Sequence, residues 1–279
     1  MPLPSLSPRE RALLALCVLL AVVAVFGPSV PASLLAGSPF AANPPASGLP
    51  DLMGVLSSLP MAAVGVWGLC WLRWLDRAHE QAQDAALMPQ AVVLPPVNAL
   101  DCAWMFFAGL ILTAAGAAFY HLQPDSMRLA ADRAGIAVAF AGLVGFAVCE
   151  RVSVRAGWPA AWFTLAGGLL AAVACFRTGN ALPWALVQFG GLSLMLALSL
   201  ARPVAGALGL KFGWAIFVFL LAKTFELLDH AVVEATHQLL SGFSLKHLAA
   251  AGASMIVLNG LQAMGRQTLR HNSGVAVTA

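Results

Sequence analysis

The sequence predicts an all-α membrane protein, a polytopic bundle of transmembrane helices. Of its 279 residues, 60% are hydrophobic and 10% are charged, whereas a soluble domain carries roughly 25% charged residues. The mean hydropathy is +0.84. The apolar residues form about eight continuous runs, most of them of roughly 17–21 residues, which is the length that a helix needs to cross the hydrocarbon. Continuous rather than alternating runs disfavour a strand barrel.

The apolar segments are residues 11–27, 52–72, 101–120, 133–150, 158–175, 182–200, 211–229 and 244–264. The first follows a basic flank, so a signal peptide cleaved in "PAS" or "LAG" is one interpretation. We favour an uncleaved first span, because it agrees with the orientation argued below. Two connections are long: residues 28–51, rich in Pro, Gly and Ser, and residues 73–100, first charged and then Pro-rich.

Basic residues predict the orientation of the chain. With eight spans, both termini share one side with Arg9, Arg11, Arg73, Arg77, Arg151, Arg155, Arg202, Lys211, Arg266 and Arg270. The other side has Arg128, Arg133, Arg177 and Lys246. This imbalance predicts cytoplasmic termini and explains the net charge of +3 without a nucleic-acid partner. In a bacterial inner membrane, the opposite side is the periplasm.

The five cysteines, in contrast, indicate no special chemistry. They are Cys17, Cys70, Cys102, Cys149 and Cys175, and no two of them form a CxxC pair. Neither a disulfide framework nor a cysteine zinc site is therefore indicated.

Ionisable residues at membrane depth are costly, so those near the span ends on the non-cytoplasmic side are candidates for function. They are His121, Asp132, Lys223, Glu226, Asp229, His230, Lys246 and His247. Each also has a structural interpretation: His121 as an interfacial residue, Lys223 with Glu226 as a helical pair, Lys246 as a snorkelling side chain, and Asp132 as a first-turn acid. Because odd spans end where even spans begin, we expect His121, Asp132 and His247 to converge, and imidazoles suit zinc.

Two segments also carry a family resemblance. "GAAFYHLQPDSMRLAADRAGIAVAF" and "KTFELLDHAVVEATHQLLSGFSLKHLAAA" resemble the bacterial branch of the alkaline ceramidase superfamily. The segment around Ser57 and Ser58 resembles the first core helix of that family. The resemblance implies a seven-helix membrane domain over 51–265, preceded by a transmembrane helix and non-cytoplasmic loop (1–50) and followed by a cytoplasmic tail (266–279).

That resemblance implies zinc-dependent hydrolysis of a ceramide-like lipid amide. His121 and His247 match two of three zinc-binding histidines, and Asp132 matches the assisting acid. The chain departs from the pattern at Ala117, where the family has a serine, and at Phe243, where it has the remaining histidine. A third ligand could come from Asp132, or from His237 or His230. The family's acidic calcium site is also missing, since residues 28–50 contain no Asp or Glu.

Three functions follow as alternatives. The first is a zinc-dependent amidase of sphingolipid-like substrates, and the second is a lipid-binding pseudoenzyme of the same fold. The third is a transporter built on Lys223, Glu226, Asp229 and His230. Transport is the least favoured of the three, because the sequence shows no inverted repeat.

Overall fold

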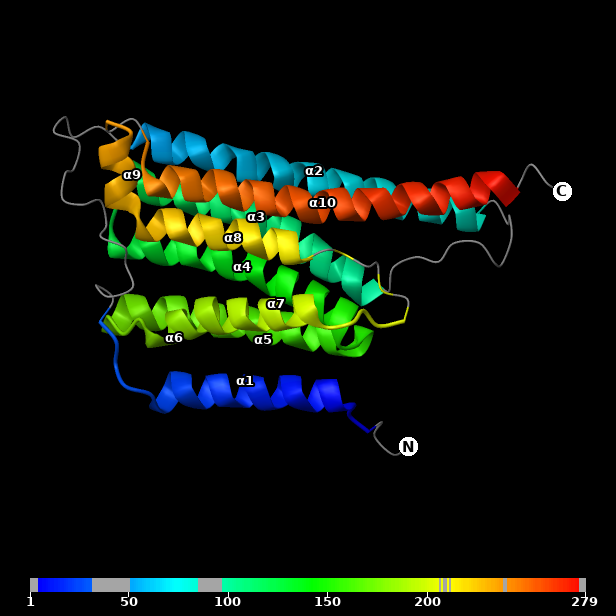
Figure 1. The fold of residues 1–279 in the computed structure, drawn as a ribbon, viewed down its shortest axis with the longest axis horizontal. Coiled ribbons are helices and arrows are strands. Elements are labelled where there is room, and N and C mark those ends of the chain that lie inside the picture. The colour runs from blue at the N-terminus through cyan, green and yellow to red at the C-terminus, as the bar shows by residue number, and fades with distance from the viewer. Residues whose placement is uncertain are drawn as a thin grey trace.

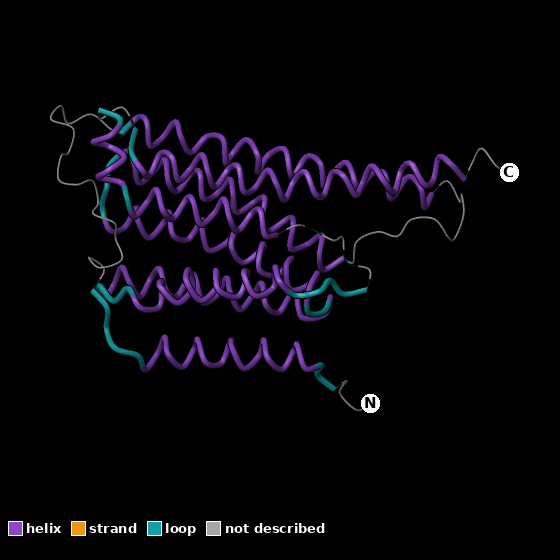
Figure 2. Tube along the Cα trace, viewed as in Figure 1, coloured by secondary structure: helices purple, strands orange, loops and turns teal. Residues whose placement is uncertain are grey.

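The computed structural model describes residues 5–31, 51–84, 97–205, 207, 210, 212–237 and 240–275. The helices are α1 (Pro8–Phe26), α2 (Leu52–Asp84), α3 (Val97–Leu122), α4 (Ser126–Arg151), α5 (Val154–Thr178), α6 (Leu182–Ala185), η2 (Leu186–Gly190), α7 (Gly191–Leu200), α8 (Phe212–Leu227), α9 (Asp229–Ala235) and α10 (Gly242–Val275). Figures 1 and 2 show them as a bundle of roughly parallel and antiparallel rods, with no strand in the described part of the chain. The predicted all-α fold class is confirmed.

The bundle belongs in a membrane. The helical stretches Leu52–Ala78, Asn98–Leu122, Ser126–Arg151, Val154–Thr178 and Leu182–Leu200 are long and apolar enough to span the hydrocarbon. They leave large apolar side chains exposed, for example Leu170 and Leu200 at 70% and 81%, which suits a surface that faces lipid rather than water. The chain is therefore an integral membrane protein.

The predicted segments all become helices, with four differences. The helix of the second segment continues to Asp84, so part of the expected connection at 73–100 is helical, while residues 85–96 lie outside the described residues. The sixth segment contains the π-helix η2 between α6 and α7, and a short helix, α9, follows α8. Helix α10 passes without interruption through the predicted domain boundary at 265–266. Most of the 28–51 loop, with the candidate cleavage sites, lies outside the described residues.

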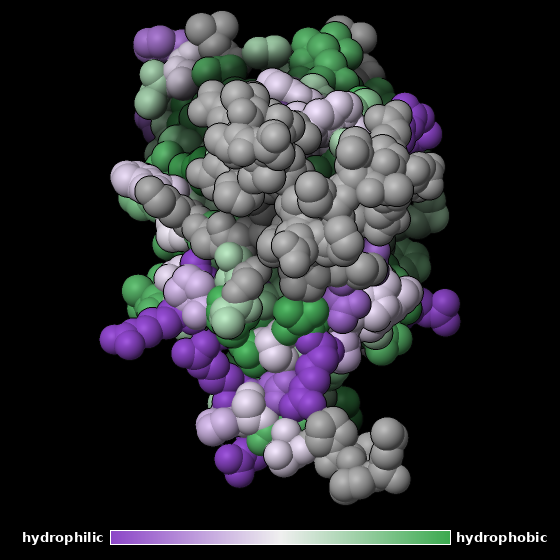
Figure 3. Space-filling view, turned by 90° about the vertical axis from the view of Figure 1, so that its right-hand side faces the viewer, coloured by the Kyte–Doolittle hydropathy of each residue, from purple (hydrophilic) through white to green (hydrophobic). Residues whose placement is uncertain are grey.

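Helix α1 begins and α10 ends at the same end of the bundle (Figure 1). Exposed Arg9, Arg11, Arg155 and Arg202 belong to this end, and Figure 3 shows hydrophilic side chains gathered there. The cytoplasmic assignment of this end remains a prediction. We call this end of the bundle the termini end. We call the opposite end, where α3 ends and where α4 and α10 begin, the site end.

Small residues bring α3 and α4 into backbone contact. A Cβ at Gly109 would overlap the backbone of Ala139, and one at Gly142 would overlap the backbone of Phe106. Close approach through small residues is typical of packing between transmembrane helices, where van der Waals contact replaces the hydrophobic effect. The contact continues to the site end, where Gly116 lies against the backbone of Asp132, so it fixes the start of α4 against the last turns of α3.

Polar contacts at the termini end fasten α1 to the bundle. Ser7 and Glu10 form a capping box at its start. Ser153 Oγ donates to Glu10 Oε1 at 2.6 Å, and Arg155 Nε donates to the same oxygen at 2.7 Å. Arg9 Nη1 donates to the carbonyl oxygen of Arg151 at 2.7 Å. Helix α1 is therefore held mainly by its polar end.

Candidate functional site

A cavity of about 250 Å³ lies inside the bundle, between α3, α4, the α6–α7 segment, α8 and α10. Its walls are largely apolar and include Phe106, Leu110, Ile136, Phe219 and Val257. Its acidic, basic and histidine lining residues are the seven residues His121, Asp132, Arg133, Lys223, Glu226, Lys246 and His247. Because these seven lie where α3 and α8 end and where α4 and α10 begin, the cavity has one polar end, at the site end, and an apolar interior.

Two buried histidines meet at this polar end. The ring centroids of His121 and His247 are 5.4 Å apart, and the rings are nearly perpendicular at 89°. Asp132 lines the same cavity and is 8% exposed. The structure thus brings together the three residues that the sequence placed in one cluster.

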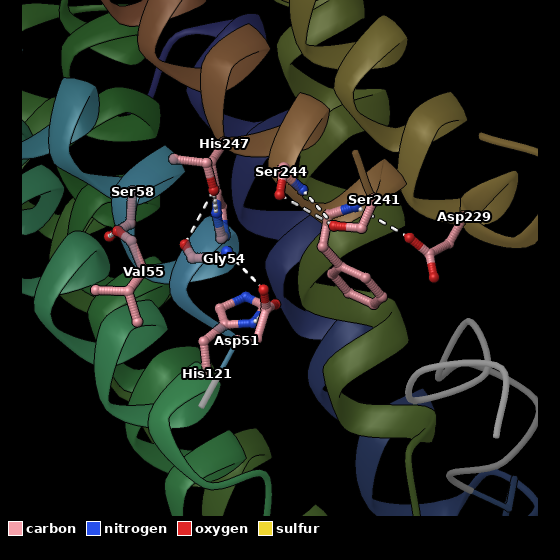
Figure 4. Close-up of polar contacts among 11 residues, drawn as sticks. Asp51, Gly54, Val55, Ser58, His121, Asp229, Ser241, Ser244 and His247 are labelled. Atoms are coloured by element: carbon pink, nitrogen blue, oxygen red, sulfur yellow. Dashed lines mark hydrogen bonds and ion pairs between the residues drawn. The ribbon is translucent and has the colours of Figure 1, made fainter. Parts of the chain in front are cut away.

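The start of α2 holds both rings from one side (Figure 4). His121 Nδ1 lies 2.9 Å from Asp51 Oδ2, and His247 Nδ1 lies 3.0 Å from Ser57 Oγ. A Cβ at Gly54 would overlap the His121 ring and the Asp51 carboxylate. Glycine at this position is therefore what allows the helix to approach the histidine.

These contacts select a tautomer for each ring. Ser57 Oγ donates to the carbonyl oxygen of Gly54 at 2.9 Å, so its single proton is used and it accepts from His247 Nδ1–H. The carboxylate of Asp51 likewise favours N–H at Nδ1 of His121. In its neutral form, each imidazole held in this way carries its lone pair at Nε2, the atom that accepts hydrogen bonds and binds metal ions.

Asp51 itself is the charged partner in this arrangement. Burial raises the pKa of the Asp51 carboxyl. Two contacts lower it: the one with His121, and the hydrogen bond that the N–H of Gly54 donates at 2.9 Å. The contacts outweigh burial, so the pKa lies below its ordinary value. Asp51 is therefore ionised at neutral pH and can fix the His121 ring.

The two departures from the family pattern lie beside the histidines. The Phe243 ring is 6.3 Å from that of His121 and lines the cavity, and the ammonium of Lys246 lies 4.6 Å above its centroid. Ala117, one turn before His121, is 1% exposed. A phenyl ring thus stands at the position where the resemblance implies an imidazole.

The residues present do not complete a catalytic zinc site. Two rings 5.4 Å apart fit neighbouring positions around one ion, given zinc–nitrogen bonds of about 2.0–2.1 Å. His230 and His237, however, are exposed and absent from the cavity lining. Over the described ranges, no group of three or more His, Cys, Asp or Glu is placed to hold a metal ion. The donor set fits two ligands, whereas a catalytic zinc takes three from the protein.

A second polar group borders the cavity on α8. Lys223 Nζ donates to Glu226 Oε2 and, at 3.0 Å, to Gln188 Oε1 on η2. Lys246 Nζ lies 3.4 Å from Glu226 Oε1. Asp229, expected in this cluster, forms a hydrogen bond elsewhere: its Oδ1 accepts from the backbone N–H of Phe243 at 3.3 Å and holds the start of α10 (Figure 4).

The sequence analysis missed several site residues. Asp51 was not predicted at all, and Ser57 entered only as part of a resemblance. Arg133 was counted only toward the charge of one side. The sequence offers one signal for these residues, which is their position along the chain. Each lies at the site end of a helix or one to two turns inside it, as His121 and His247 do.

No protein-family model matches the chain, and no curated protein matches it. The resemblance to the alkaline ceramidase superfamily therefore remains an expectation that rests on motif spacing.

Proposed function

We propose that this chain is an integral membrane protein that binds a single amphiphilic lipid in its cavity, as a ceramidase-like fold whose hydrolytic site has been altered. The observation that carries the proposal is the cavity itself: apolar walls, polar groups at one end, and a phenylalanine beside His121 in place of a third metal ligand. The acyl chain lies along the apolar interior and the head group lies at the polar end.

Recognition depends on the head group. A lipid chain leaves one apolar environment for another when it moves from the bilayer into the cavity, so chain burial adds little affinity beyond van der Waals packing. Nε2 of neutral His247 and the carboxyl oxygens of Asp132, both in the cavity lining, are hydrogen-bond acceptors, which suit the N–H and O–H groups of an amide or hydroxyl head group. Buried polar partners of this kind discriminate strongly between ligands.

Saturable binding of a short-chain fluorescent ceramide to the protein in detergent micelles tests the proposal. Ala250 lines the cavity, so Ala250→Leu should weaken binding at least tenfold by occupying the chain's space, a loss of about 1.4 kcal/mol. Ala115→Leu adds the same methylenes to an exposed position of α3 and should bind like the wild type. No saturable binding by the wild type, or equal binding by both variants, would contradict the proposal.

A zinc-dependent amide hydrolase is the second candidate. It is favoured by the histidine pair at 5.4 Å and by the Asp51 and Ser57 contacts on Nδ1, the type of support that metal-binding histidines usually have. Zinc stoichiometry and hydrolysis of the same ceramide distinguish the two functions. Turnover by the unmutated protein, lost on addition of a chelator and in His121→Ala, would establish the hydrolase.

A further inference from the structure

One buried cation of the cavity, Arg133, takes part in no ion pair of the described residues. Arg133 is 7% exposed and lines the cavity. Its Nη1 donates to Cys175 Sγ at 2.8 Å, and its guanidinium lies 5.3 Å from the centroid of the Trp184 ring.

This arrangement is electrostatically incomplete. A guanidinium stays charged in proteins, and a buried charge at membrane depth is costly unless it is paired. A thiol and an aromatic ring supply only partial negative charge. They hold the guanidinium in place without neutralising it.

The other charges of the cavity do not complete it. Arg133, Lys223 and Lys246 face the same cavity as Asp132 and Glu226, so the lining carries three cations and two carboxylates. Glu226 already contacts both lysines. Asp132, the preceding residue of α4, interacts electrostatically with Arg133 across the cavity lining, but the two side chains form no ion pair.

We propose that the cavity selects an anionic amphiphile, with a carboxylate or phosphate group paired with Arg133 and the apolar chain along the cavity walls. The planar guanidinium can bind either group through two parallel hydrogen bonds. Asp132, which precedes Arg133 in α4 and lines the same cavity, would accept a hydrogen bond from an N–H or O–H group of the same ligand. The inference rests on the proposed lipid-binding function and adds to it a preference for an acidic head group over a neutral one such as that of ceramide.

Chain-matched probes test this selectivity. Equilibrium binding of hexadecyl phosphate, hexadecanoate and hexadecanol is measured in uncharged detergent micelles. The amount of each probe that partitions into protein-free micelles is subtracted. The wild type should bind both acids at least tenfold more tightly than the alcohol, and Arg133→Gln should bring all three to the affinity of the alcohol. Arg133→Lys should retain part of the preference. Arg128→Gln removes a cation from the same helix outside the cavity lining and should leave the preference unchanged.

The possible results separate the two proposals. If the wild type binds the acids and the alcohol equally, or if Arg133→Gln keeps the preference, the assignment of Arg133 is overturned while lipid binding stands. Displacement of hexadecyl phosphate by millimolar inorganic phosphate would overturn the amphiphile in favour of a soluble anion. Binding of none of the three, and no binding of ceramide, would overturn the proposed function itself. Each variant is first checked for a monodisperse peak in gel filtration.

Discussion

Arg133 and Arg151 lie near opposite ends of the same helix, α4, and the structure treats them differently. Both are 7% exposed, and each guanidinium lies near an aromatic ring, at 5.3 Å from Trp184 and 5.8 Å from Phe212. Arg151 donates to the carbonyl oxygens of Ala201 and Leu210 at 3.0 and 2.7 Å. Arg133 has a thiol as its hydrogen-bond partner.

The difference separates a structural charge from a functional one. At the termini end, Arg151 ties the chain after α7 to α4, and Glu150 Oε2 accepts from the N–H of Leu210 at 3.3 Å. At the site end, Arg133 faces a cavity rather than a backbone carbonyl. Backbone carbonyls hold both Nη atoms of Arg151, although its Nε has no hydrogen-bond partner among the described residues, whereas a thiol holds one Nη of Arg133 beside the cavity.

The largest expected effect is the loss of stability on removal of Arg151. Arg151→Gln leaves the buried carbonyl of Leu210 and the partly buried carbonyl of Ala201 without their donor and should lower the free energy of unfolding by roughly 2–4 kcal/mol. Arg133→Gln removes an unpaired charge, so its unfolding free energy should be equal to or above that of the wild type. Thermal unfolding of both variants in the same detergent measures the difference, and equal destabilisation would erase the distinction between the two arginines.

A smaller effect is expected at the contact between α2 and His121. Gly54→Ala places a Cβ against the His121 ring and the Asp51 carboxylate, which should destabilise the protein by roughly 1–3 kcal/mol and weaken ceramide binding. Gly213→Ala is the control, because a Cβ at Gly213 meets nothing within 4 Å. If Gly54→Ala behaves like this control, the close approach of α2 is not required.

The smallest effect concerns the charge of Asp51. The pKa of this carboxyl is below its ordinary value, so its contribution to stability is fully present above the unfolded pKa, about 3.9, and is lost as pH falls through the folded pKa. The wild type should therefore exceed Asp51→Asn in melting temperature by a constant margin above about pH 5, and the margin should narrow at lower pH. A margin that grows on acidification would contradict the sign of the shift.

Hydropathy could predict the helices, because membrane-spanning segments need long apolar runs and their ends follow from polar residues. It could also predict that His121, Asp132 and His247 share one end, since antiparallel helices alternate direction. It could not predict the partners Asp51 and Ser57, which depend on how closely Gly54 lets α2 approach. Nor could it distinguish Arg133 from Arg151, because the two differ in what surrounds them rather than in local sequence.

The zinc content of the purified protein tests most directly the claim that this site is a lipid cavity and not a complete metal centre. The wild type, exchanged into zinc-containing and then zinc-free buffer, should retain well under one ion per chain. Phe243→His with Ala117→Ser should retain about one, because residues 243 and 247 are one helical turn apart and a third imidazole would meet the three-ligand requirement. One tightly held zinc per wild-type chain, with ceramide turnover, would contradict the account and establish the hydrolase.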